Sequence, residues 1–348
     1  MLGIRVAFKV YQPIFYEEVF MIKYSGFKKI ARMTKAVALA SGLIFGFGSV
    51  AEASNLVPYT TFFNTDYSSF GYGGMRNIGT GTITVSGTTG PATNALLYWH
   101  GPGNSSSPTA NSSVLFNGNR VDGVSLGLSS DNCWGFPNSQ AYRADVTPYV
   151  TGDGAYSLSD FRKPGTADIN GVSLVSFYDD GVSANNRDLV IFNGNDSNIS
   201  NSYDANGWNI TLAGINYTTG SAYLEMHVSD GQTWLDDAVK INGINIVPSG
   251  ANFQGNSTPF GASAGSTNGS LWDIRRFDIT SFLTPGFNTI NMTTGVNSDC
   301  LSCVLIGIDL PAGAAPEQPV IPEPSTFLLM GSGIIGAVIV RKRLRKKL

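Results

Sequence analysis

The sequence predicts an all-β body made of two tandem β-sandwiches, preceded by a signal peptide and followed by a transmembrane helix. Three observations support this prediction. Asn-Gly and Asp-Gly pairs, which favour tight hairpin turns, occur ten times between Asn117 and Gly269. Short apolar runs such as Ala95–Trp99 and Val172–Tyr178 alternate with these turns, and no long amphipathic helical pattern accompanies them. Cations gather at the two ends of the chain, beside its apolar segments.

The N-terminal end has the pattern of a secretory signal peptide. Four cations precede the uncharged run 36–50, and Ala51 and Ala53 then supply the small residues that signal peptidase recognises. Ser54 is the expected first residue of the mature chain. The alternative is an N-terminal membrane anchor, which the short run and the cleavage site disfavour. We therefore predict an N-terminal extension and signal peptide over residues 1–53, with signal peptidase as a partner.

The charge of the body excludes one class of partner. Between Ser54 and Val320 there are nine Lys and Arg residues against 21 Asp and Glu residues, a net charge of about −12. A surface this acidic does not attract a nucleic-acid backbone, because that attraction depends on cationic side chains that displace counterions. We therefore predict no nucleic-acid partner.

The body repeats itself once. Three blocks recur in the same order, at offsets of 125, 133 and 130 residues, which argues for two related units. The matched blocks are Leu115–Gly118 with Lys240–Gly243, Arg143–Val150 with Arg276–Leu283, and Leu174–Tyr178 with Val304–Ile308. We place the first β-sandwich at 54–199 and the second at 200–311. Asp145 and Asp278 occupy equivalent places, where we expect each to cap the following Thr-containing turn rather than to bind a ligand.

The repeated pattern has a loose likeness to known domains. In each unit a strand ends at Asn-Gly, and an Asp-(Val/Ile)-Thr segment later precedes a Gly-containing turn. This order resembles jelly-roll, galactose-binding-like domains, and it is also similar to the β-rich modules of some prokaryotic surface adhesins. The resemblance implies jelly-roll-like sandwiches. It implies no ligand, because one fold serves many functions.

The C-terminal end predicts a membrane-spanning segment of marginal length. Phe327–Val340 carries no charge, but as a helix it is about 21 Å long, against a hydrocarbon core of about 30 Å. Six cations follow within the last eight residues, so a buried core helix is excluded and the tail should stay cytoplasmic. We predict a Pro-rich linker at 312–325, a transmembrane helix at 326–340 and a basic cytoplasmic tail at 341–348.

The linker holds the most specific motif of the chain. Pro322, Glu323 and Pro324, the apolar stretch and the basic cluster together resemble the PEP-CTERM sorting signal. The resemblance implies a Gram-negative bacterium in which exosortase recognises the tripeptide and the helix is then removed. It also implies a chain that is anchored in the inner membrane before processing and lies afterwards at the cell surface or outside. Such systems accompany exopolysaccharide, which becomes a candidate partner.

The three cysteines predict a disulfide. Cys300 and Cys303 have the spacing of a redox or half-zinc motif, but no second pair accompanies them. In an oxidising compartment a disulfide is favoured, either between Cys300 and Cys303 or from Cys133 to one of them.

Two segments, Gly123–Gly127 and Gly261–Gly265, fit the nucleophile elbow of esterases. Their surroundings indicate turns and hairpins rather than the strand–turn–helix that an elbow needs, so we predict no catalytic residue. His100 and His227 are too few for a zinc centre, and we expect His100 in a loop beside Gly101.

We predict no cofactor, with one alternative. The pairs Asp179–Asp180 and Asp236–Asp237 could help to bind Ca²⁺ at loops, although neither belongs to an EF-hand-like run. The five tryptophans could include sugar-stacking platforms, but most are expected in the core. The sequence therefore favours a non-enzymatic envelope or extracellular-matrix protein. The alternatives are a glycan-binding module associated with exopolysaccharide and a carbohydrate-active enzyme.

Overall fold

The computed structural model describes residues 55–130, 133–255 and 270–315. Within these ranges the chain forms β-strands and two single-turn 3-10 helices, and it contains no α-helix. The predicted all-β body is therefore confirmed, and its sheets are sandwich-like. The predicted signal peptide, linker motif, transmembrane helix and basic tail lie outside the described ranges. A search of the described part finds no helix that combines the length and the apolar character needed to span a membrane.

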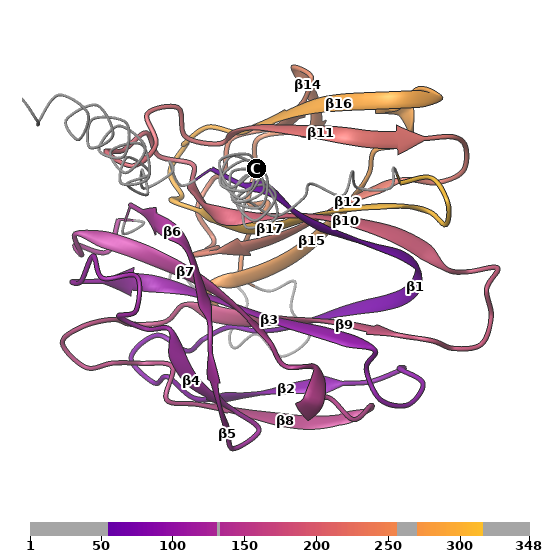
Figure 1. Ribbon diagram of the computed structural model, residues 1–348. Helices are drawn as coiled ribbons and strands as arrows, with labels where there is room; N and C mark the ends of the chain where they lie inside the picture. Colours follow the sequence, from indigo (N-terminus) through magenta and orange to yellow (C-terminus); the bar gives the residue numbers. More distant parts are fainter. Residues whose placement is uncertain (1–54, 131–132, 256–269, 316–348) are drawn as a thin grey trace, which may run out of the picture. The chain divides into compact units, whose positions relative to one another are not determined.

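The first half of the body packs a four-stranded outer sheet on an inner sheet (Figure 1). The outer sheet consists, in spatial order, of β2 (Gly81–Val85), β8 (Gly154–Ser159), β4 (Ser113–Phe116) and β5 (Asn119–Asp122). The inner sheet consists of β9 (Gly171–Tyr178), β3 (Asn94–Gly103), β7 (Asn138–Asp145) and β6 (Val124–Ser129), and the 3-10 helix η1 (Thr147–Tyr149) follows β7. Apolar side chains from the two facing sheets, with Trp99 and Phe116 among the largest, fill one core.

The second half repeats this arrangement. Its outer sheet consists of β11 (Asn209–Tyr217), β16 (Gly286–Thr293), β13 (Val239–Ile241) and β14 (Ile244–Val247). Its inner sheet consists of β10 (Arg187–Ser197), β17 (Ser302–Pro311), β12 (Tyr223–Ser229) and β15 (Trp272–Asp278), and η2 (Thr280–Phe282) follows β15. A second core, which includes Phe192, Trp208 and Phe253, lies between these sheets.

Equivalent strands occupy the same place in both halves. The outer order β2-β8-β4-β5 corresponds to β11-β16-β13-β14, and the inner order β9-β3-β7 corresponds to β17-β12-β15. With β1 beside β9 and β10 beside β17, each half has the strand order of a jelly roll. The repeated Asn-Gly pairs join β4 to β5 and β13 to β14. Asn117 and Asn242 have φ values of 48° and 51°, as two-residue hairpin turns of type I′ require.

One long strand joins the halves. In β1 (Val57–Tyr72), the first part pairs antiparallel with β10 from Val57↔Asn193 to Thr65↔Arg187. The second part pairs with β9 from Asp66↔Tyr178 to Tyr72↔Val172. Figure 1 shows this strand passing from the upper inner sheet into the lower one. The strand β10, which precedes the boundary predicted at 199/200, is hydrogen-bonded to β17 of the second half.

The two inner sheets also pack face to face. A third core contains side chains from both of them, with Tyr98 and Phe177 from the first half and Trp272 and Leu305 from the second. Together with the cores within each half, this gives four layers in the order outer, inner, inner, outer (Figure 1). The polar residues between the inner sheets are therefore enclosed on both sides, and they require partners within the protein.

Candidate functional site

Most of the sites predicted with a specific role lie outside the described part of the chain. These are the signal peptidase residues Ala51, Ala53 and Ser54 and the sorting residues Pro322, Glu323 and Pro324. Their roles remain predictions. The described residues contain the cysteines, both histidines, the paired aspartates and the tryptophans.

The cysteines form a bridge between the halves. Cys133, in the loop between β6 and β7, is joined to Cys300, in the loop between β16 and β17, with Cα atoms 6.2 Å apart. This pairing is one of those that the sequence left open. Cys303 is a free thiol in β17 and is fully buried in the second core, so it is not available as a surface nucleophile.

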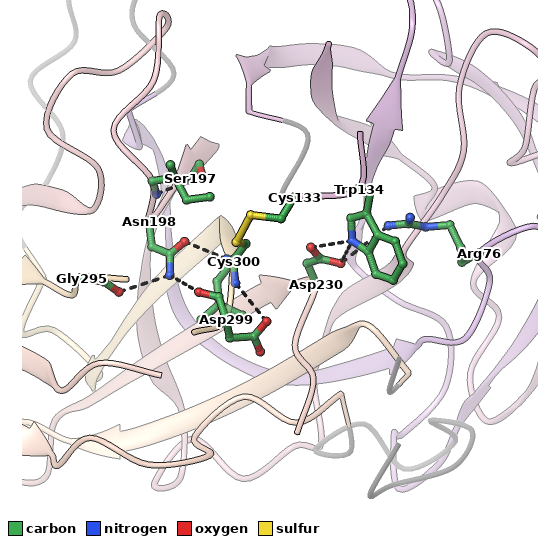
Figure 2. The surroundings of a disulfide bond; sticks show 11 residues. Arg76, Cys133, Trp134, Ser197, Asn198, Asp230, Gly295, Asp299 and Cys300 are labelled. Atoms are coloured by element: carbon green, nitrogen blue, oxygen red, sulfur yellow. Dashed lines mark hydrogen bonds and ion pairs between the residues drawn. A yellow bond between two sulfur atoms is a disulfide. The ribbon is translucent and has the colours of Figure 1, made fainter. Parts of the chain in front are cut away.

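The disulfide stands beside a polar anchor that also joins the halves (Figure 2). The Nε1–H of Trp134 donates to both carboxylate oxygens of Asp230, at 2.6 and 2.8 Å. The guanidinium group of Arg76 lies over the Trp134 ring, 3.9 Å from its centroid, and forms an ion pair with Asp230 at 3.6 Å. Trp134 is therefore fixed by a hydrogen bond and a cation–π contact, and the guanidinium group of Arg76 covers one face of its ring.

His100 does not lie in a loop as predicted. It is fully buried within β3, which continues to Gly103 by pairing with β7. Beyond His100, where the pairing of β3 with β9 ends, Pro102 takes part only as an acceptor, from the N–H of Asp168 at 2.8 Å, and this bond does not need the N–H that proline lacks. His100 Nδ1 lies 2.7 Å from Ser229 Oγ, across the junction between the inner sheets. Burial, with a smaller effect from the charge of Arg76, lowers the pKa of His100 to about 3.

His227 makes the matching contact in the opposite direction. It lies on β12, the counterpart of β3, and its Nδ1 is 2.7 Å from Ser173 Oγ on β9 of the first half. Its Nε2 is 3.0 Å from Glu225 Oε1, which also accepts a hydrogen bond from Ser69 Oγ at 2.5 Å. Burial raises the pKa of Glu225, but the hydrogen bonds of His227 and Ser69 and the charges of His227 and Arg276 together outweigh it, so the pKa lies below its usual value.

Ser173, His227 and Glu225 thus have the connectivity of a hydrolytic triad, a hydroxyl beside an imidazole that a carboxylate orients. Ser173 and His227 are fully buried between two sheets, and Glu225 is 7% exposed, so a substrate has no path to the hydroxyl. Ser125, the serine of the first predicted elbow, lies inside strand β6 and is not followed by a helix. The second elbow lies outside the described residues. What these buried groups do is hold the inner sheets together.

The paired aspartates differ in their surroundings. Asp179 and Asp180 follow β9 and come close to Asp66 of β1, with one carboxylate oxygen of each within 4.8 Å of the others. The three carboxylates accept hydrogen bonds from backbone N–H groups of the same turn. Asp66 accepts from the N–H of Asp180, at 2.9 Å, and Asp179 accepts from that of Gly181, at 2.8 Å. Asp180 accepts from Val182 N and from Asn185 Nδ2, the latter being the largest cause of its lowered pKa. The cluster is explained as a turn.

A pocket lies next to this turn, where β1 passes between the inner sheets. Phe62, Phe63 and Asn64 of β1 line one side, and Tyr178 and Asp179 line the other. Asp179 is the one carboxylate among the side chains that line this pocket. The two opposed carboxylates that a glycosidase needs are therefore not present in its wall.

Asp236 and Asp237 are separated by their surroundings. Asp236 is buried, and its Oδ2 accepts the N–H groups of Asn252 and Phe253. Burial is the main cause that raises the pKa of Asp236 and of Asp299 to about 7. Asp237 accepts from the N–H of Ala238 at the loop surface. The two side chains therefore do not converge on one ion.

The aspartates of the repeated blocks are caps, as predicted. Asp145 Oδ1 accepts from both the N–H and the Oγ1 of Thr147, at 2.9 and 2.6 Å. Asp278 Oδ1 accepts from the N–H of Thr280, at 2.8 Å.

Among the tryptophans, Trp99, Trp208 and Trp272 are buried, and Trp234 is the exposed one at 47%. Trp234 stands beside Leu235, which is 53% exposed.

The comparisons with known proteins bear on the C-terminal end. Residues 320–343 match the family model of the PEP-CTERM protein-sorting motif. The matched region includes the Pro-Glu-Pro tripeptide, the apolar stretch and the first cations of the tail. No curated protein matches the chain. The chain therefore carries the PEP-CTERM protein-sorting motif, the signal of exosortase substrates.

Proposed function

We propose that this chain is a non-enzymatic protein of the cell surface or extracellular matrix of a Gram-negative bacterium, exported as a membrane-anchored precursor and processed by exosortase. The observation that carries the proposal is the sorting motif at residues 320–343. The disulfide between Cys133 and Cys300 supports it, because such bonds form and persist in oxidising compartments outside the cytosol. The acidic, turn-rich body agrees with an extracellular location.

The signal would act through simple physical properties. The six terminal cations resist transfer across the membrane, so the precursor stops with its body outside. The uncharged stretch Phe327–Val340 is short for a full span, which makes the anchor marginal and suited to removal. Pro322 and Pro324 keep the tripeptide extended and out of the helix, where an enzyme at the membrane surface can bind it.

Replacement of Pro322, Glu323 and Pro324 by alanine tests this proposal. The variant should keep its C-terminal helix and remain in the membrane fraction, whereas the wild-type chain should lose the helix and leave that fraction. Mass spectrometry of the C-terminal peptide and cell fractionation measure the two effects. A matched control replaces Pro316, Glu317 and Pro319, the same residue types a few positions upstream. Equal processing of both variants would refute sorting by the tripeptide.

A second candidate, glycan binding by the body, is favoured by one observation. Trp234 is exposed next to Leu235, and a flat indole ring on a surface suits stacking against sugars. Electrophoresis through gels that contain the exopolysaccharide of the producing cells would test it. Trp234→Ala should abolish retardation, while Phe287→Ala, at another exposed aromatic residue, should not. Equal retardation of wild type and both variants would remove this candidate.

A further inference from the structure

The end of strand β10 places an aspartate in the second core. Asp196 pairs with Cys303 of β17, whose side chain belongs to that core, so the Asp196 side chain lies on the same face of the sheet. Asp196 is fully buried. Neither of its carboxylate oxygens has a hydrogen-bond partner among the described residues.

A second aspartate meets it from the loop that follows. Asp204 lies in the loop 198–208 and is 4% exposed. Its Oδ1 accepts the N–H of Asn206 at 2.9 Å, but its Oδ2 is buried and has no partner in the described part of the chain. Burial, and then a side-chain hydrogen bond with Asp204 in the protonated form and the charge of Asp204, raise the pKa of Asp196 to about 9. The two side chains are therefore close enough to interact.

The loop 198–208 is held in place by several hydrogen bonds. Trp208 Nε1 donates to the backbone carbonyl oxygen of Asp196, so the end of the loop is hydrogen-bonded to the end of β10, where the loop begins. The side chain of Asn201 accepts the N–H groups of Tyr203 and Asp204, at 2.8 and 3.1 Å. The loop also reaches the first half, because Tyr203 Oη donates to Asn138 Oδ1 at 2.9 Å. The loop that carries Asp204 thus touches both halves.

Three buried carboxylate oxygens without a donor require a positive partner. An unpaired charge is costly in a protein interior, and buried charges are normally paired or bound to a metal. Within the described residues, no Lys, Arg or His forms an ion pair with Asp196 or Asp204. The partner must therefore be a bound cation or a proton.

We propose that Asp196 and Asp204 form a buried calcium site that fixes the loop 198–208 over the junction of the two halves. The ligands would be the three donor-free oxygens, completed by water or by carbonyl oxygens of the loop. Oxygen-only ligation suits a hard cation such as Ca²⁺. The nearby thiol of Cys303 is directed instead to the carbonyl of Leu305, which argues against a soft metal.

Terbium luminescence provides the direct test, because Tb³⁺ substitutes for Ca²⁺ and is excited by a nearby indole. In the exported, EDTA-treated protein, Tb³⁺ should emit on tryptophan excitation through Trp208, and Ca²⁺ should compete with it. Asp204→Asn and Asp196→Asn should each lose this signal. Asp180→Asn, in the turn cluster beside Asp66, serves as the matched control and should retain it.

A thermal melt provides the second readout. Ca²⁺ at about 100 times its Kd should raise the Tm of the wild-type protein by about 5–10 °C and should leave that of Asp204→Asn unchanged. Failure of Ca²⁺ to shift the wild-type Tm, together with stabilisation by Asp196→Asn, would show that the pair shares a proton and would overturn the proposal. Loss of the terbium signal in Asp180→Asn alone would place the ion at the turn and would overturn it equally.

Discussion

At the scale of single residues, the two histidines act as reciprocal cross-links. His100 of the first half contacts Ser229 of the second, and His227 of the second contacts Ser173 of the first. Each pair is fully buried, so each hydrogen bond satisfies two groups that water cannot reach. The histidines therefore contribute to the docking of the inner sheets through these two buried hydrogen bonds.

His100 should make the stability of the protein depend on pH in a defined window. Its folded pKa of about 3 lies below the unfolded value of about 6.5, so between these values the unfolded chain binds more protons. Stability from neutral His100 is therefore complete above pH 6.5 and is lost as pH falls. His100→Gln should flatten the pH dependence by up to about 1.4 kcal/mol per pH unit, measured by urea unfolding at pH 4 to 7.

The measured quantity is the difference in the free energy of unfolding between the wild type and His100→Gln. The buried carboxyl groups titrate in both proteins, so their contributions cancel in this difference. Above pH 7 the free energies of unfolding should differ between the two proteins by a constant amount. Parallel curves from pH 4 to 6 would show that His100 does not hold a depressed pKa.

At the scale of strands and turns, the sequence predicts those features that depend on residues close together in the chain. The Asn117-Gly118 hairpin and the Asp145 cap were predictable, because their partners lie within a few positions. The strands around Val172–Tyr178 were predictable from short apolar runs between turns. The all-β class follows from the same local signals.

The remaining features depend on partners that are far away in the sequence. His100 was expected in a loop because Gly101 and the next residues suggest a turn, yet two neighbouring strands hold it in the sheet. Its serine partner is 129 residues away. Asp196 and Asp204 carry no sequence signal, since Asp-rich loops are common in this chain and only burial distinguishes these two. The double pairing of β1 is likewise a tertiary feature.

At the scale of the whole body, the disulfide is the one covalent cross-link, besides the backbone itself, between the halves in the described part of the chain. Cys133 and Cys300 are 167 residues apart in sequence, so the bond closes a long loop. A cross-link of this kind restricts the unfolded chain, and its loss typically costs a few kcal/mol. It reinforces contacts that the third core and the histidine pairs already make.

Loss of this bond should lower stability without abolishing the fold. The double variant Cys133→Ser/Cys300→Ser should lose about 2–5 kcal/mol in the free energy of unfolding, measured in denaturant. Reduced wild-type protein serves as the control and should match the variant. Thiol counting on the denatured exported protein should find one free cysteine, Cys303. Three free thiols, or equal stability of oxidised and reduced protein, would contradict the prediction.

The double pairing of β1 also sets an order of events for a chain that crosses a membrane N-terminus first. This strand emerges before β9 and β10, whose paired residues follow 100 or more positions later. The pairing of β1 with both inner sheets therefore waits until about half of the body has emerged, and contacts of such long sequence separation form slowly. Slow pairing of β1 would favour passage through a secretory pore, because such a pore admits only unfolded chains. Until β9 and β10 have emerged, periplasmic chaperones would have to shield the unpaired β1.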